Sequence, residues 1–150
     1  MEVRLPYTGA RYRMYFNRFR VEREQGLWFV QFGLVVSGEL IDSFSCAIPA
    51  FVLSEHKKSL AEFLGRLPAD NEERVQWKGV PSTKGTTVVD VINMAYRGDM
   101  SEINFHGFSM HGATAIGRAS SPGPIDSDYL AVLRSTVPLL KQVIAALYEE

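Results

Sequence analysis

The sequence has little of what would cross-link a fold or bind a metal. Its 150 residues include one cysteine, Cys46, so no disulfide can form within the chain and a reducing compartment is expected. The histidines and the cysteine show none of the His-x-x-His or Cys-x-x-Cys spacings that are typical of zinc sites. We therefore expect a hydrophobic core to hold the fold, with no metal and no cofactor.

Charge excess and long apolar runs are also missing. The formal net charge is -1, without the basic surplus of a protein that binds duplex DNA. The longest strongly apolar run, residues 27–36, is about half of the roughly 20 residues that a membrane helix needs. The first 14 residues contain no apolar stretch typical of a secretory signal. The expected location is the cytoplasm, away from membranes.

The composition is that of an ordinary globular domain, with 46% hydrophobic and 22% charged residues. We predict one α+β domain over residues 1–150, made of two halves that each contain antiparallel strands and then a helix. The halves cover about residues 11–67 and 86–149, and residues 68–85 connect them. This (βββα)×2 order would place two helices over antiparallel sheet.

In the first half, the alternation of apolar residues slips by one position near Asn17 and Arg18. Because side chains alternate along a strand, the slip predicts a bulge there or, as the alternative, a break into two strands. Turns are expected around Gly26 and Gly38, where glycine tolerates positive φ. The other expected elements are strands over residues 27–36 and 43–48 and a helix over residues 54–67 capped by Ser54.

In the second half, the pattern predicts a hairpin, a further strand and a long helix. Pro138 falls inside that helix and is expected to kink it. Its apolar stripe would cover the sheet and partly contact a second subunit, through Leu133, Val137, Leu140 and Ile144. The expected elements are strands over residues 87–96, 101–108 and about 112–118, a helix from Asp126 to residue 149, and a short candidate strand in the connector over residues 74–78.

Two short motifs resemble known sites but have the wrong spacing. Residues 107–112, Gly-Phe-Ser-Met-His-Gly, carry His111 where the nucleophile elbow of hydrolases needs glycine, and no later histidine could complete a triad. Residues 82–87 place lysine before glycine and so lack the order of a phosphate-binding P-loop. Neither motif supports catalysis, and we predict a protein that is not an enzyme.

His106 and His111 could approach one another across a tight hairpin, with His56 as a third imidazole. In an uninterrupted strand, however, residues five apart face opposite sides. We therefore favour strand histidines that bond to the backbone or lie at an interface, and we keep both as candidate binding residues.

The first strand combines arginines with aromatic residues, which suits base stacking and phosphate neutralisation on an antiparallel sheet. In the simpler alternative, Tyr12, Met14 and Phe16 face the core, and the arginines are solvated and pair with acids such as Glu22 and Glu24. The candidate binding residues on these strands are Arg11, Arg13, Tyr15, Arg18 and Arg20.

At the level of architecture, the order of strands and helices resembles two groups of binding proteins. One is the SecB-like export chaperones, which implies an oligomer that binds proteins, and the other is the PUR and Whirly type, which implies binding of single-stranded nucleic acid. We predict a self-associating protein-binding module, such as a chaperone, adaptor, inhibitor or immunity protein. Single-stranded nucleic-acid binding is the alternative, and an enzyme with an unrecognised site is third.

Overall fold

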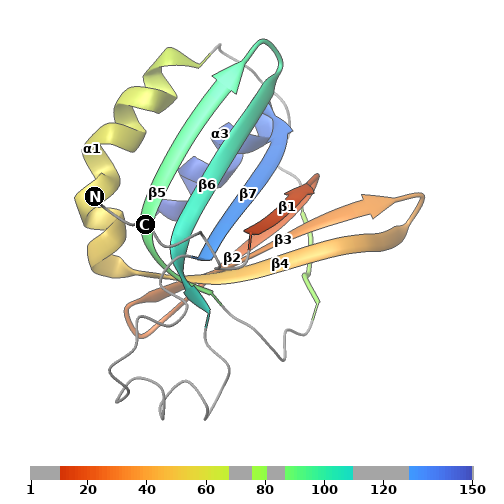
Figure 1. Cartoon of the computed structure of the whole chain (residues 1–150), viewed down its shortest axis with the longest axis horizontal. Coiled ribbons are helices and arrows are strands. Elements are labelled where there is room, and N and C mark those ends of the chain that lie inside the picture. The colour runs from red at the N-terminus through yellow and green to blue at the C-terminus, as the bar shows by residue number, and fades with distance from the viewer. Residues whose placement is uncertain (1–10, 68–75, 81–86, 110–128, 150) are drawn as a thin grey trace, which may run out of the picture.

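The computed structural model describes residues 11–67, 76–80, 87–109 and 129–149 (Figure 1). Within them the chain is α+β, with a mostly antiparallel sheet of seven strands and two helices, which confirms the predicted class. The elements are β1 (Arg11–Tyr15), β2 (Arg18–Glu24), β3 (Leu27–Val36), β4 (Glu39–Pro49), α1 (Ala50–Arg66), β5 (Thr87–Arg97), β6 (Met100–Ser109), β7 (Tyr129–Thr136) and α3 (Val137–Leu147).

The sheet is closed by two residues, Phe16 and Asn17. The strand order is β1-β7-β6-β5-β4-β3-β2, so the first two strands lie at opposite ends of the order although they are neighbours in the chain. The amide of Phe16 donates to the carbonyl oxygen of Arg134 on β7 at 2.9 Å. The next amide, of Asn17, donates to the carbonyl oxygen of Gly33 on β3, also at 2.9 Å. The segment Phe16–Asn17 thus bonds to β7 on one side and to β3 on the other.

The side chain of Asn17 completes this junction. Its Nδ2 donates to the carbonyl oxygen of Val35 at 2.8 Å, and its Oδ1 accepts from the Val35 amide at 2.9 Å. A side-chain amide carries the same donor and acceptor as a peptide group, so it pairs with β3 as a strand residue would. Of the two predicted alternatives near Asn17, the structure has the break into two strands, because β1 pairs with β7 and β2 with β3.

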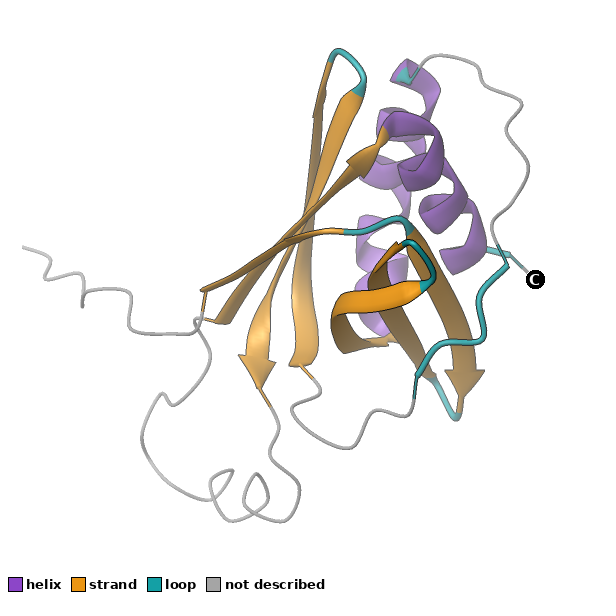
Figure 2. Ribbon diagram, turned by 90° about the vertical axis from the view of Figure 1, so that its right-hand side faces the viewer, coloured by secondary structure: helices purple, strands orange, loops and turns teal. Residues whose placement is uncertain are grey.

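Each helix directly follows a strand of the sheet: α1 follows β4, and α3 follows β7. β4 pairs in parallel with β5 through only two residues of each strand, and α1 then lies beside β5 (Figure 1). His56 links α1 to β5, because its Nε2 accepts a hydrogen bond from the Ile92 amide at 3.3 Å. Its Nδ1 bonds to the carbonyl oxygen of Val52, within α1, at 2.8 Å. In the same way, α3 follows β7 and contacts β6, β7 and β2. Figure 2 shows both helices on one side of the curved sheet.

The core lies between the sheet and these helices, and its centre is aromatic. The rings of Phe16 and Phe32 meet edge to face with centroids 4.8 Å apart, and those of Phe32 and Phe105 are 5.9 Å apart. Because Phe16 belongs to the junction, the same residue closes the sheet and fills its interior. Most of α3 is buried here, which agrees with the apolar stripe in its sequence.

The predicted start of the first helix is wrong. α1 begins at Ala50, not at Ser54, and its N-cap is Pro49, with extended backbone at φ -63 and ψ 147. Proline ends the strand because it lacks an amide hydrogen, and helix formation follows directly. In the connector, the candidate strand over residues 74–78 is not seen in its described part, since residues 76–80 form no strand.

The predicted kinked helix is also wrong. Residues 129–136 form β7, paired with β6 and β1, and Pro138 lies in the first turn of α3. Proline is favoured there because the first amides of a helix have no intrahelical partner. The sequence was misleading because Leu133 and Val137 continue the helical spacing into the strand. The strand predicted over 112–118 and the cap at Asp126 lie outside the described residues.

We predict that Asn17→Ala lowers the free energy of unfolding by about 2 kcal/mol, because it leaves the amide and carbonyl groups of Val35 without their partner. Asn17→Asp should cost at least as much, since its carboxylate still accepts the Val35 amide but places a second, negatively charged oxygen against the Val35 carbonyl oxygen. Urea denaturation of the three proteins measures the difference. A loss below about 0.5 kcal/mol for Asn17→Ala would show that the junction does not depend on this side chain.

Candidate functional site

The arginine-rich strand presents alternate residues to the core and to solvent. Met14 and Phe16 are buried, whereas Arg13 is exposed and Tyr15 is 52% exposed. Arg11 occupies the corresponding position in the backbone register, opposite Leu130 of β7. Met14 and Phe16 thus follow the simpler alternative and face the core, whereas Tyr15 shares the exposed side with Arg13.

The sheet register places several of the predicted site residues on one face that neither of the two described helices covers, which we call the outer face. Tyr15 lies opposite Arg134, which in turn lies opposite Glu102. Arg13 lies opposite Val132, and His106 is on the same side of β6 as Glu102. Residues of β1, β6 and β7 that are far apart in sequence therefore share this surface.

Ion pairs reduce the positive charge of this region. Arg134 Nε donates to Glu102 Oε1 at 3.0 Å, and this hydrogen bond, with the charge of Glu102, raises the pKa of Arg134. On β2, Arg20 pairs with Glu22 at 2.7 Å. Arg18 donates to the backbone oxygen of Asn17 at 3.0 Å. These cations are held by their own neighbours, as in a solvated face.

The histidines do not form a metal site in the described part of the chain, where no group of three potential ligands occurs. His56 bonds to the backbones of α1 and β5, while His106 lies half-buried on the outer face. His111 lies outside the described residues.

A second surface is the far end of the β3–β4 hairpin, residues 34–41, which we call the ribbon. It projects from the rest of the sheet in Figure 1. Val36, Leu40 and Ile41 are 49%, 41% and 59% exposed. From Glu39 to Ser45, no described strand pairs with the outer edge of β4, and within this stretch the Ser43 amide donates to Asp42 Oδ1 while the Ser43 carbonyl oxygen accepts from the Tyr12 hydroxyl. The ribbon thus combines exposed aliphatic side chains with an open strand edge.

The residues predicted as a subunit interface are inside the chain. They are at most 4% exposed and pack in its own core, on β7 and α3: Leu133, Val137, Leu140 and Ile144. Their burial leaves no apolar stripe of α3 for a partner helix. The stripe covers the sheet, which was the first of its two expected roles.

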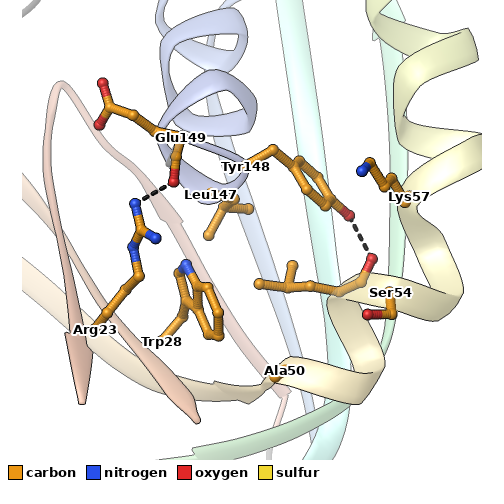
Figure 3. Close-up of a pocket in the computed structure, with 9 residues that line it drawn as sticks. Arg23, Trp28, Ala50, Ser54, Lys57, Leu147, Tyr148 and Glu149 are labelled. Atoms are coloured by element: carbon orange, nitrogen blue, oxygen red, sulfur yellow. Dashed lines mark hydrogen bonds between the residues drawn. The ribbon is translucent and has the colours of Figure 1, made fainter. Parts of the chain in front are cut away.

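A pocket of about 480 Å³ lies where the start of α1, the end of α3 and the β2–β3 hairpin meet (Figure 3). Its walls are fixed by contacts between these elements. Tyr148 donates to the carbonyl oxygen of Leu53 at 2.8 Å. The guanidinium of Arg23 lies 5.5 Å from the ring centre of Trp28 and donates to the backbone oxygen of Glu149.

Sequence reasoning missed both the ribbon and the pocket, for different reasons. The apolar residues Leu40 and Ile41, directly after the turn at Gly38, could have indicated that the strand begins there. The third strand was expected to begin only at residue 43, so the ribbon was missed. The nine residues that line the pocket, among them Arg23, Lys57 and Tyr148, come from three distant segments. No local pattern brings them together.

The chain matches no known family model, no curated protein and no solved structure. Among the described helices, none is long and apolar enough to cross a membrane.

Tyr148 predicts a specific loss of stability at high pH. Burial raises the pKa of its phenol to about 12, above the value of about 10 in an unfolded chain. The neutral phenol therefore stabilises the fold fully below about pH 10, and this contribution is lost as the pH rises towards about 12. Tyr148→Phe should lose about 1 kcal/mol near neutral pH, with the hydrogen bond to Leu53.

Urea denaturation of wild type and Tyr148→Phe at about pH 8 and about pH 11 compares the two effects. The gap in stability between the proteins should narrow at the higher pH. A gap that stays constant would contradict the role given to the buried phenol.

Proposed function

We propose that this chain is a non-enzymatic protein-binding module that contacts its partner through the ribbon. The observation that carries the proposal is the projection of Val36, Leu40 and Ile41 into solvent at the end of β3 and β4. Large aliphatic side chains that are grouped on a projecting element are typical of interaction surfaces, whereas single ones are common anywhere.

The open edge of β4 suggests how a partner would bind. Unpaired amides and carbonyls on a strand edge can pair with an added strand, with affinity from the backbone and selectivity from alternating side chains. Leu40 and Trp77 both lie over Gly33, where a Cβ would meet the Trp77 ring at 2.8 Å. Gly33 thus supports a compact packing at the base of the ribbon, and the ribbon beyond it stays exposed.

Self-association is part of this proposal, with the ribbon now in place of the last helix. Two copies could pair along the Glu39–Asp42 edges of β4 in antiparallel fashion, short of Ser43, whose backbone groups are bonded to Asp42 and Tyr12, and this pairing would bury Leu40 and Ile41. The buried, unpaired Cys46 fits the predicted cytoplasmic location.

The internal repeat and the resemblance to SecB-like, PUR and Whirly proteins remain part of the proposal. Supporting the repeat, β2-β3-β4-α1 and β5-β6-β7-α3 have the same order. In addition, β5 has a register shift between Val89 and Val91, and the corresponding β1–β2 segment breaks at Asn17.

Single-stranded nucleic-acid binding is the second candidate, because the register gathers Arg13, Tyr15 and Arg134 on the outer face. If it is correct, Arg13→Gln with Tyr15→Ala should weaken binding of a labelled oligonucleotide in fluorescence anisotropy, and Arg66→Gln, at the exposed end of α1, should not. The absence of any binding at low salt would exclude this candidate.

The ribbon is tested with Ile41→Lys, which places a charge on the open edge. We expect it to reduce the recovery of a partner from native cells at least about tenfold, equivalent to about 1.4 kcal/mol. A matched control is Phe51→Lys on α1, since Phe51 is a 63% exposed apolar residue outside the ribbon. The measurement is quantitative mass spectrometry of proteins that co-purify with each variant.

The same variants test self-association by light scattering. Wild type and Phe51→Lys should form the same oligomer, and Ile41→Lys should be smaller. The ribbon hypothesis fails if Ile41→Lys folds and retains both its oligomer and its co-purifying proteins.

A further inference from the structure

The pocket at the ends of α1 and α3 has the build of a small-molecule site. Its volume of about 480 Å³ falls within the range of about 300–1,000 Å³ that is usual for ligand pockets. Apolar surface comes from Leu53 and Leu147, which are 4% and 1% exposed, and from the ring of Trp28. The contacts of Tyr148 and Arg23 described above hold these walls in place without a ligand.

The charges that line the pocket favour an anion. Arg23 and Lys57 enter from opposite walls, on β2 and α1 (Figure 3). Among the described residues of the lining, Glu149 is the single acid, and Figure 3 shows its carboxylate directed away from the two cations. Tyr148 adds no charge at physiological pH, because burial raises its pKa to about 12.

Donors on α1 support the same ligand chemistry. Ser54 and Lys57 are three residues apart, so they lie on the same face of the helix and can bind one anionic group together. The first turn of α1 contains no acidic residue, so no carboxylate of that turn offsets its positive end.

The indole of Trp28 supplies an independent observation. Its Nε1 is buried and has no hydrogen-bond partner among the described atoms. In Figure 3 this nitrogen lies on the side of the ring that faces Arg23 and Leu147. An unpaired buried N–H is costly, and an acceptor that reached this nitrogen after a shift of the side chains that cover it would provide the missing bond.

We propose that this pocket binds a small organic carboxylate, with its charged group at Lys57 and Ser54 and its apolar body against Trp28 and Leu53, while Arg23 adds positive charge from the opposite wall. A free inorganic anion would leave the apolar walls unused, and a neutral apolar molecule would leave the cations unpaired. The site is separate from the ribbon and does not depend on the proposed protein partner.

Benzoate is a suitable probe, with benzamide as the uncharged molecule of similar shape and phosphate as the anion without an apolar body. The readout is the pair of tryptophan indole signals in nitrogen–proton NMR spectra, assigned with Trp28→Phe. Benzoate should shift the Trp28 signal in a saturable way and leave Trp77, which packs on Gly33, unchanged. Benzamide and phosphate should bind at least about tenfold more weakly.

Lys57→Gln should weaken benzoate binding about tenfold, and Lys58→Gln, on the same helix but outside the lining, should leave it unchanged. Both lysines are exposed, so neither variant is expected to unfold the protein. Equal binding of benzoate and benzamide, full binding to Lys57→Gln, or no saturable shift of Trp28 would each overturn the proposal.

Discussion

Two consecutive backbone amides, those of Phe16 and Asn17, bond to β7 on one side and to β3 on the other. A strand has donors and acceptors on both edges, so a single segment can join two sheet edges that would otherwise stay open. The side chain of Asn17 adds a further pair of bonds to Val35, where the backbone has already turned towards β7. Phe16 fills the space enclosed by this closure.

The closure of the sheet determines the positions of the outer face, the ribbon and the pocket. Because β1 pairs with β7, Arg13 shares the outer face with Arg134 instead of lying beside β3, the partner of β2. β2 pairs with β3 only from Leu27 to Gly33. The ribbon therefore extends beyond the sheet, with Val36 and Ile41 exposed. The β2–β3 turn comes to lie against the ends of both helices, and the pocket forms between them.

Local patterns predicted β3 from its continuous apolar run, the turns at Gly26 and Gly38 from their glycines, and the hairpin of β5 and β6. They also located the irregularity at Asn17, but not its cause, since the bonds to Arg134 and Gly33 join residues far apart in sequence. The last helix was predicted too long because an apolar strand that leads directly into a helix keeps a compatible spacing. No sequence pattern predicted the pocket, because the charged residues that line it come together only after folding.

Native-state hydrogen exchange at Phe16 and Asn17 tests the closure most directly. These residues lie between two strands and would exchange rapidly, as a loop does, if β1 and β2 were merely connected. The closed sheet predicts that both amides exchange as slowly as those in the centre of β3, through global unfolding. Rapid exchange at these two amides, with β3 protected, would contradict the account.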